Sequence, residues 1–246
     1  MDSQLKEFAK QYEHNGFSCI QRVLNPARVS ALSAALSDLP ETEAVRRKDS
    51  IYGVRNLLDL SPAVCELATE PEIWRYAQAI LGNEARAVRA IFFNKTADAN
   101  WGLRWHQDSV IAVREQRDVS GYSAWACKAG VWQVRPPAAI LSRMLAIRIH
   151  LDPCGVENGA LRVLPGSHRE GWVKGGAAAW KTRVAEVVCT VEAGGIVAMC
   201  PLLLHASAKA ASPVRRRVIH IEYVAKELPD GLDWRWSLMR RQNTVL

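Results

Sequence analysis

The clearest indication of the fold class lies in residues 144–166, MLAIRIHLDPCGVENGALRVLPG. Every second residue from Leu145 to Leu151 is apolar, which predicts a strand with one apolar face. Asn158-Gly159 and Pro165-Gly166 are turn signals, and they enclose a second apolar run, Ala160–Leu164. Short strands joined by tight turns are typical of an antiparallel sheet.

Further short runs rich in Val, Ile and Phe lie on both sides of this stretch. They alternate with Gly, Pro and Asn, as antiparallel strands do. The strands predicted in this way are Ala87–Lys95, Met144–Leu151, Ala160–Leu164, Val187–Val191, Ile196–Cys200 and Arg217–Ala225. Many short strands that follow a helical segment favour an α+β domain whose sheet half is a double-sheet jelly roll.

The first third of the chain is predicted to be helical. Asn25 and Pro26 provide a helix cap and a first-turn proline, and apolar residues between Val29 and Leu39 then fall on one helical face. Ser61-Pro62 and Glu70-Pro71 repeat this opening. We therefore expect an α+β, mainly β fold: a double-stranded β-helix (jelly roll, cupin-like) with N-terminal helices packed on one sheet.

The length of the chain favours one elaborated domain over residues 1–246. Its expected parts are a mainly helical part (1–85), a jelly-roll core (86–226) and a C-terminal extension (227–246). Residues 113–142 contain Gly, Trp and a Pro pair without clear periodicity. Because loops of this length are usually functional lids or disordered, we interpret this segment as a lid over a site.

The net charge of +7 arises from 32 Lys and Arg against 25 Asp and Glu, and residues 201–246 hold much of the excess. Such a surplus can serve solubility or anionic small molecules, and it argues only weakly for nucleic acid without a recognition motif. No zinc-finger, basic-zipper or RNA-binding signature is present. We therefore expect a small-molecule substrate as the partner and no nucleic acid, and the sequence leaves the oligomeric state open.

The six cysteines form no CxxC pair, which is typical of a protein in a reducing compartment. The first nine residues lack the apolar run of a signal peptide, and no segment approaches about 18 consecutive apolar residues. We expect a cytoplasmic protein with no membrane association.

Three histidines stand two residues before a carboxylate: His106–Asp108, His150–Asp152 and His220–Glu222. On a strand, residues i and i+2 share a face, so each pair could offer an imidazole and a carboxylate to one cation. Two histidines and one carboxylate form the facial triad of Fe(II) oxygenases. His205 follows an apolar run and is the best candidate for a further ligand.

The sequence context separates the three pairs. His106 precedes a strand-like run, so this pair could lie where a strand opens into a cavity. For His150 a structural role is the preferred interpretation, and Asp152 before Pro153 is typical of a turn. His220 and Glu222 are expected to form a structural ion pair.

Arg215, Arg216 and Arg217 are consecutive, so on a strand at least one of them must point inward. An inward arginine could bind a carboxylate through two parallel hydrogen bonds, which lysine cannot do. A solvated basic edge is the alternative.

These residues resemble the phytanoyl-CoA dioxygenase-like branch of the Fe(II)/2-oxoglutarate-dependent dioxygenases. The resemblance runs from Gly16 to about Tyr223 and is strongest in WHQD at 105–108, in NGAL at 158–161 with PGSH at 165–168, and after His205. It implies that His106, Asp108 and His205 bind iron. It also implies that Arg216 and Ser207 bind 2-oxoglutarate, that Lys95 assists, and that His168 is no ligand.

The resemblance implies a hydroxylase that uses Fe(II), 2-oxoglutarate and O2. It would oxidise an unactivated C–H bond of a small molecule and release succinate and CO2. The carboxylate of Asp108 favours hydroxylation or another oxidation over halogenation, because related halogenases have a small residue in its place.

Arg148 stands near a position where the family commonly has tryptophan. Its cation indicates either an anionic substrate or a structural pairing with Asp152 or Glu157. The residues predicted to line the substrate pocket are Arg148, Trp105, Gln107, Trp125, Tyr52 and Arg55. The tryptophans Trp101, Trp105, Trp125 and Trp132 either wall that pocket or belong to an ordinary aromatic core.

Two other classes of protein remain compatible with the sequence. A cupin-like Zn or Mn enzyme, a hydrolase or isomerase without 2-oxoglutarate, would use His150 or Glu222 as a fourth ligand. A binding module that acts through its basic C-terminal end would bind generic DNA with a steep salt dependence.

Overall fold

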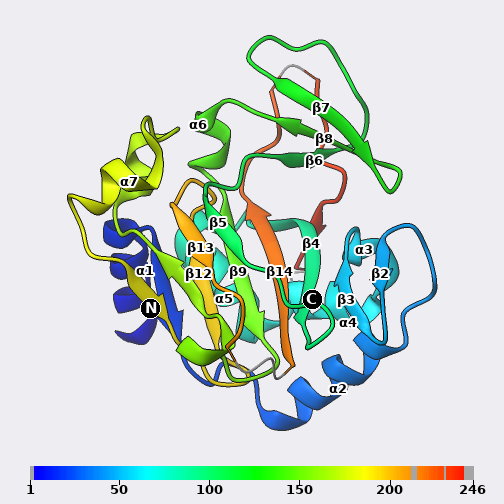
Figure 1. Cartoon of the computed structure of the whole chain (residues 1–246). Helices are drawn as coiled ribbons and strands as arrows, with labels where there is room; N and C mark the ends of the chain where they lie inside the picture. Colours follow the sequence, from blue (N-terminus) through cyan, green and yellow to red (C-terminus); the bar gives the residue numbers. More distant parts are fainter. Residues whose placement is uncertain (1–2, 212–214, 230, 241–246) are drawn as a thin grey trace.

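Two antiparallel sheets lie one in front of the other in the computed structural model, which describes residues 3–211, 215–229 and 231–240 (Figure 1). The large sheet has the order β1 (Phe17–Ile20), β12 (Ile196–Met199), β9 (Leu145–His150), β14 (Arg216–Val224), β4 (Arg86–Lys95), β3 (Ile51–Val54) and β2 (Val45–Arg47), and β15 (Leu238–Met239) also pairs with β4. The small sheet has the order β11 (Val187–Cys189), β10 (Leu161–Val163), β13 (His205–Ser207) and β5 (Leu103–His106).

The chain moves back and forth between these sheets. Strands β4, β9, β12 and β14 belong to the large sheet, whereas β5, β10, β11 and β13 belong to the small one. This alternation is that of a double-stranded β-helix, so the predicted fold class is confirmed. All six predicted strands are present, and their boundaries shift by at most two residues at either end.

Helices cover the outer face of the large sheet, as predicted. They are α1 (Ser3–Asn15), α2 (Pro26–Ser37), α3 (Leu57–Leu60), α4 (Pro62–Thr69) and α5 (Pro71–Leu81). The Asn25 side chain caps α2 by accepting a hydrogen bond from the Arg28 N–H. Apolar stripes of these helices, such as Ile73 and Ala77 of α5, share one buried core with Ile147 and Ile219 of the sheet.

The N-terminal part is less helical than predicted, because it also contributes β1, β2 and β3 to the large sheet. These strands have only three or four residues, too few for an alternation to be recognised in the sequence. β2 and β3 extend the sheet beyond β4 through the pairing of Gly53 with Phe93, whereas β1 forms the opposite edge by pairing with β12.

The segment predicted to be a lid has regular structure. It forms a third sheet of order β6 (Ile111–Val113), β8 (Val131–Arg135) and β7 (Ser123–Lys128), followed by α6 (Ala138–Leu141). The β7–β8 hairpin projects at the top of Figure 1. Strand β7 was missed because SAWACK is half-exposed or exposed along its length and contains weak strand formers, whereas β8, VWQVR, contains strong strand formers and was missed nonetheless.

Within the predicted C-terminal extension, Trp234 forms a bridge with Val113, and β15 pairs with β4. Residues 241–246 of that extension lie outside the described residues. A short helix, α7 (Gly176–Lys181), packs beside β5. Among the described residues, no helix combines the length and the apolar character needed to cross a membrane.

Candidate functional site

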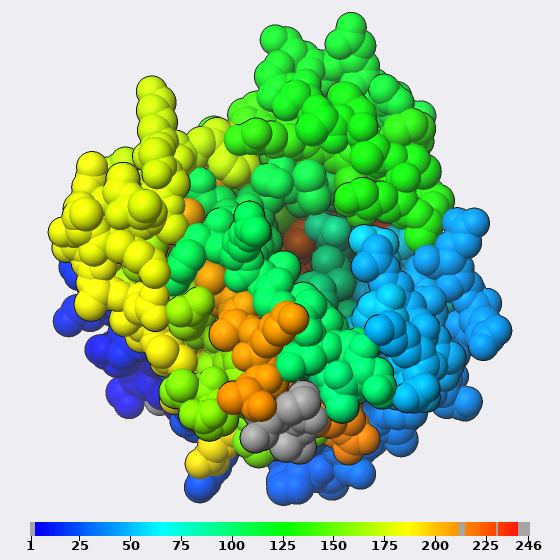
Figure 2. All heavy atoms as spheres, viewed as in Figure 1, coloured from blue at the N-terminus to red at the C-terminus, as the bar shows by residue number. Residues whose placement is uncertain are grey.

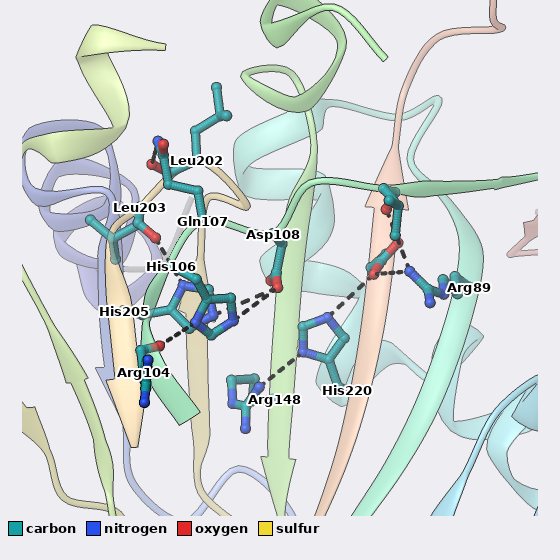
Figure 3. Close-up of polar contacts among 12 residues, drawn as sticks. Arg89, Arg104, His106, Gln107, Asp108, Arg148, Leu202, Leu203, His205 and His220 are labelled. Carbon is teal, nitrogen blue, oxygen red and sulfur yellow. Dashed lines mark hydrogen bonds and ion pairs between the residues drawn. The ribbon is translucent and has the colours of Figure 1, made fainter. Parts of the chain in front are cut away.

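Strand pairing brings two of the predicted metal ligands together. His205 at the start of β13 lies opposite His106 at the end of β5, and their ring centroids are 4.2 Å apart. Asp108 follows two residues later, where its N–H donates to the Pro201 carbonyl at 2.9 Å. Its Oδ1 lies 3.7 Å from His106 Nε2 and 3.6 Å from His205 Nε2 (Figure 3). One ligand atom from each residue lies within 4.8 Å of the other two.

Backbone carbonyls hold both imidazole rings in place. His106 Nδ1 lies 2.7 Å from the Arg104 oxygen, and His205 Nδ1 lies 2.8 Å from the Leu203 oxygen. A carbonyl can only accept, so each Nδ1 carries the proton and each Nε2 offers its lone pair toward Asp108. The strand ends thus orient the ligands before any metal binds.

The protonation states suit a cation. Burial lowers the pKa of His205 to about 4, so its ring is neutral near pH 7. Burial alone would raise the pKa of the Asp108 carboxyl, but the surrounding histidines and Arg148 outweigh burial and lower it. Two imidazoles that direct Nε2 at one point and one carboxylate form the donor set of the facial triad, so these residues fit Fe(II).

The triad lies at a cavity of about 850 Å³ that opens between the two sheets. Figure 2 shows the surface hollowed between the light-blue N-terminal segment and the green hairpin above it. The floor is the inner face of the large sheet, where β4, β9 and β14 present polar side chains in register. Lining residues from this face include Arg89, Arg148, Arg216, His220 and Glu222.

Of the three consecutive arginines, Arg216 points into the cavity. Arg217 forms a two-pronged ion pair with Asp152, at 2.7 and 2.9 Å, and Arg215 is exposed. Arg216 is only 4% exposed, and Nη1 donates to the Gly159 carbonyl while Nε has no partner among the described residues. A buried guanidinium without a carboxylate is suited to an anionic ligand.

Gly159 explains the turn signal that precedes β10. Its φ of +67° is in the left-handed region, and a Cβ there would lie 2.6 Å from the Ala208 oxygen. Only glycine permits this close approach, which brings its carbonyl to Arg216.

Ser207 and Lys95 lie next to Arg216. Ser207 lines the cavity, and Lys95 is opposite Arg216 in the β4–β14 register. The Lys95 amine is fully buried and donates to Ser207 Oγ at 3.3 Å and to the Ala208 carbonyl at 2.5 Å. Burial, together with the positive charge of Arg216, lowers its pKa to about 7. Lys95 therefore contacts Ser207 without lining the cavity itself.

A series of contacts between polar side chains crosses the floor of the cavity. Arg148 Nη1 lies 3.2 Å from His220 Nδ1, His220 Nε2 lies 3.5 Å from Glu222 Oε1, and Arg89 is 3.3 Å from the same oxygen (Figure 3). An arginine can only donate, so the His220 proton is on Nε2 and faces Glu222. His220 and Glu222 are in contact as expected, but with this tautomer the contact is between a neutral imidazole and a carboxylate, and both side chains line the cavity.

The interpretation that Asp152 or Glu157 pairs with Arg148 is wrong, because Asp152 is held by Arg217 and Arg148 contacts His220. Burial and the charge of Arg216 lower the pKa of Arg148 to about 10. His150, next along β9, has neither ring nitrogen hydrogen-bonded among the described residues and is not part of the triad.

Of the residues predicted to line the substrate pocket, some line the cavity and others do not. Tyr52 and Arg55 line the cavity together with Arg148. Gln107 also lines it, but Nε2 donates to the Gly171 and Leu202 carbonyls at 2.7 and 2.6 Å, and Oε1 accepts from the Val173 N–H. This amide ties three loops together and has no free donor for a substrate.

Trp105 and Trp125 lie outside the cavity lining. Trp105 alternates with His106 along β5 and packs outward, with the Lys181 amine 4.6 Å from its ring centre. Trp125 packs with Trp132 on the core beneath the hairpin. Of the four tryptophans considered, Trp101 lines the cavity, where its ring meets that of Tyr52 edge to face at 6.3 Å.

Sequence reasoning missed several basic residues of the cavity: Arg46, Lys48, Arg89 and Lys128. Arg89 could have been found, because it alternates with Ile91, Phe93 and Lys95 on one face of β4. The others lie on or beside β2 and β7, which carry no recognisable strand pattern.

Comparison with known sequences supplies the family context. The sequence profile of phytanoyl-CoA dioxygenase (PhyH) matches residues 12–218. Ectoine dioxygenase of Nocardia farcinica is 26% identical over 167 residues, which cover 64% of this chain and 49% of that protein. The enzyme of the same name from Bordetella bronchiseptica is 25% identical over 170 residues, which cover 65% and 48%. The chain spans about half the length of these curated relatives.

Solved structures resemble the whole chain. Apo EctD from S. alaskensis superposes with a TM-score of 0.72 at 19% identity, covering 98% of this chain and 87% of that one. The epimerase SnoN, in complex with Fe3+, alpha ketoglutarate and nogalamycin RO, superposes with a TM-score of 0.70 at 18% identity, covering 98% and 97%. At these identities the likeness establishes the fold.

Proposed function

The chain belongs to the phytanoyl-CoA dioxygenase family, and from this membership and the geometry of its site we propose that it is an Fe(II)- and 2-oxoglutarate-dependent dioxygenase. It hydroxylates an unactivated C–H bond of a small-molecule substrate. The observation that carries the proposal is the convergence of His106, Asp108 and His205 on one point of a cavity. The same cavity contains Arg216, which has no carboxylate partner among the described residues.

His106, Asp108 and His205 hold the iron. When bound, the metal supplies, with 2-oxoglutarate and O2, the oxidation of the substrate with release of succinate and CO2. The protein keeps the His205 ring neutral by burial and directs both Nε2 atoms through the Arg104 and Leu203 carbonyls. These contacts favour metal binding near neutral pH.

Arg216 holds the distal carboxylate of 2-oxoglutarate, and the Ser207 hydroxyl donates to the same group. Support comes from the burial of Arg216 and from the lack of a carboxylate partner for it among the described residues. Lys95 fixes the Ser207 side chain through its amine. The co-substrate thereby supplies the negative charge that this end of the cavity lacks.

The Zn or Mn alternative receives no support from the ligand geometry. It would need His150 or Glu222 as a fourth ligand. In the described part of the chain the ligating group contains only the triad, and Glu222 is engaged by Arg89 and His220.

A reducing, cytoplasmic location suits this chemistry. All six cysteines are free, including Cys127, which is exposed. A reducing environment also keeps iron in the Fe(II) state.

The test is turnover of 2-oxoglutarate by the purified protein. With Fe(II), 2-oxoglutarate and O2, the protein forms succinate slowly even without substrate, and Asp108→Ala abolishes it. Zn2+ in place of Fe(II) serves as the matched metal control and gives none. Absence of succinate above the metal-free blank, with iron shown to be bound, overturns the proposal.

A further inference from the structure

We propose that the substrate carries an oxyanion, a carboxylate or a phosphate group, and that Arg46, Arg55 and Arg89 bind it in the part of the cavity remote from Arg216. That this ligand is the substrate rests on the function proposed above. The anion site itself stands on the placement of these three residues, called here the arginine cluster.

Arg89 is separated from the co-substrate residues along the sheet. Arg46 and Arg55 are separated from them across it, because they lie on or beside β2 and β3, whereas Arg216 lies on β14, on the other side of β4. Arg89 lies opposite Glu222, whereas Arg216 lies opposite Lys95. Glu222 and Arg216 are six residues apart on one strand, roughly 20 Å at about 3.3 Å per residue. One dicarboxylate held by Arg216 therefore leaves the arginine cluster free.

Strands β2 and β3 direct Arg46 and Arg55 to the cavity. Arg46 is opposite Gly53, and Gly53 is opposite Phe93, which lines the cavity. The Arg46 side chain lies across Gly53, since a Cβ on that glycine would be 3.8 Å from Arg46 Cδ. Arg55 is two residues beyond Gly53 and so lies on the same face.

The three cations of the cluster lie close enough to affect one another. Partial burial lowers the pKa of Arg55, and the charges of Arg46 and Arg89 lower it further. Within the described ranges no carboxylate lies within ion-pair distance of Arg46 or Arg55, and Arg89 shares Glu222 with His220. The cluster therefore carries uncompensated positive charge.

The remainder of the cavity does not supply the missing anion. Seven lysines and arginines line it, against three aspartates and glutamates. Asp108 lies between the two ligand histidines, Glu222 is paired with Arg89, and Asp98 forms no ion pair with a lysine or arginine of the described residues. Even with 2-oxoglutarate at Arg216, the lining keeps a net positive charge.

The hairpin adds a further cation to this region. Asn56, next to Arg55, donates to the Ala129 carbonyl at 2.8 Å and so fastens the hairpin tip. Lys128, beside that tip, lines the cavity. A cleft lined by one sign of charge attracts ligands of the opposite sign, and arginine pairs bind oxyanions through parallel hydrogen bonds.

The test is calorimetric binding of two probes, pyrophosphate and tricarballylate. The protein is loaded with Fe(II) and saturated with 2-oxoglutarate under anaerobic conditions, so that Arg216 is occupied. The double variant Arg46→Gln/Arg55→Gln is compared with Arg114→Gln/Arg143→Gln, which removes the same charge from exposed residues outside the cavity. The single variant Arg46→Gln, at an exposed side chain, replaces the double variant if that melts early.

At least one probe should bind to the wild type. The double variant of the arginine cluster should bind that probe about tenfold more weakly or worse, which corresponds to the loss of one or more hydrogen bonds to a charged group. The control pair should change it less than about twofold. Binding of pyrophosphate alone identifies a phosphate substrate, and binding of tricarballylate alone identifies a carboxylate. Failure of both probes to bind, or equal loss in the control pair, overturns the proposal.

The two proposals can fail separately. If the iron-loaded protein makes no succinate, the dioxygenase function is wrong, whereas the anion site is still judged by probe binding. Arg216→Gln distinguishes the sites: with the 2-oxoglutarate concentration raised until the variant is saturated as well, it should leave probe affinity unchanged. Loss of probe binding in this variant would place the anion at the co-substrate end and refute the arginine cluster.

Discussion

Replacing Arg216 by glutamine should weaken 2-oxoglutarate binding far more than the same change at either neighbouring arginine. The side chain is 4% exposed, and its one hydrogen-bonded oxygen partner within the described residues is the Gly159 carbonyl. A carboxylate bound there would be largely desolvated. Removing one partner of a buried, hydrogen-bonded charge pair costs about 2–5 kcal/mol, which corresponds to roughly 30-fold to 5,000-fold in affinity.

The neighbouring arginines provide matched controls. Arg215→Gln changes an exposed side chain, and the affinity should stay within about twofold. Arg217→Gln breaks the pair with Asp152, so it should lower the melting temperature and affect 2-oxoglutarate less than Arg216→Gln does. The same charge is removed in all three variants, so a difference between them in 2-oxoglutarate affinity reflects where each side chain points and not the loss of charge itself.

The assay is anaerobic calorimetry of 2-oxoglutarate binding to the iron-loaded protein, with the KM for 2-oxoglutarate from succinate formation as a second readout. Circular dichroism of each variant confirms that it is folded. Equal weakening in all three variants would show that general positive charge, rather than an inward Arg216, attracts the co-substrate. No weakening in Arg216→Gln would refute the assignment of this residue.

Three further predictions concern the support of the site. Gln107→Leu removes three hydrogen bonds to backbone groups of Gly171, Val173 and Leu202 and leaves those groups without these bonds. The free energy of unfolding, measured by urea titration, should therefore fall by about 1–3 kcal/mol, and an unchanged midpoint would contradict this. The folded pKa of Lys95, about 7, lies below its ordinary 10.5, so the unfolded chain binds more protons between these pH values. The unfolding free energy therefore rises from near pH 7 to near pH 10, and Lys95→Met should flatten that rise; identical slopes would refute the burial argument. Asn56→Ala removes the bond to the Ala129 carbonyl, at about 1 kcal/mol, and should speed proteolytic cleavage in the β7–β8 hairpin relative to Asn158→Ala, at an exposed turn.

The jelly roll could be predicted because its core strands have alternating apolar faces. Leu145, Ile147 and Ile149 mark one face of β9, and the turn at Gly159 marks where the chain passes to the small sheet. Strands β2 and β7 carry no such signal, since most of their side chains are half-exposed or exposed. Their positions come from pairing with neighbours, which a local pattern does not contain.

The candidate site, like the fold, could be predicted from the sequence only in part. The ligands could be identified from motif spacing, since His106 and Asp108 are close in sequence and the family spacing links His205 to Arg216. Trp105 was predicted to line the pocket, but it and His106 are neighbours on one strand, so their side chains point to opposite faces. The partner of Arg148 could not be predicted either, because the sequence does not reveal that Arg217 forms an ion pair with the Asp152 carboxylate.

The assignment of the iron site to His106, Asp108 and His205 is tested most directly by the anaerobic affinity of the protein for Fe(II). Alanine at any of the three should weaken binding by more than about 100-fold, because removing even a residue that only orients a ligand costs about 10- to 100-fold. His150→Leu and His168→Ala, at histidines outside the ligating group, should leave one iron per chain at unchanged affinity. A loss of iron in His150→Leu as large as in His205→Ala would contradict the account.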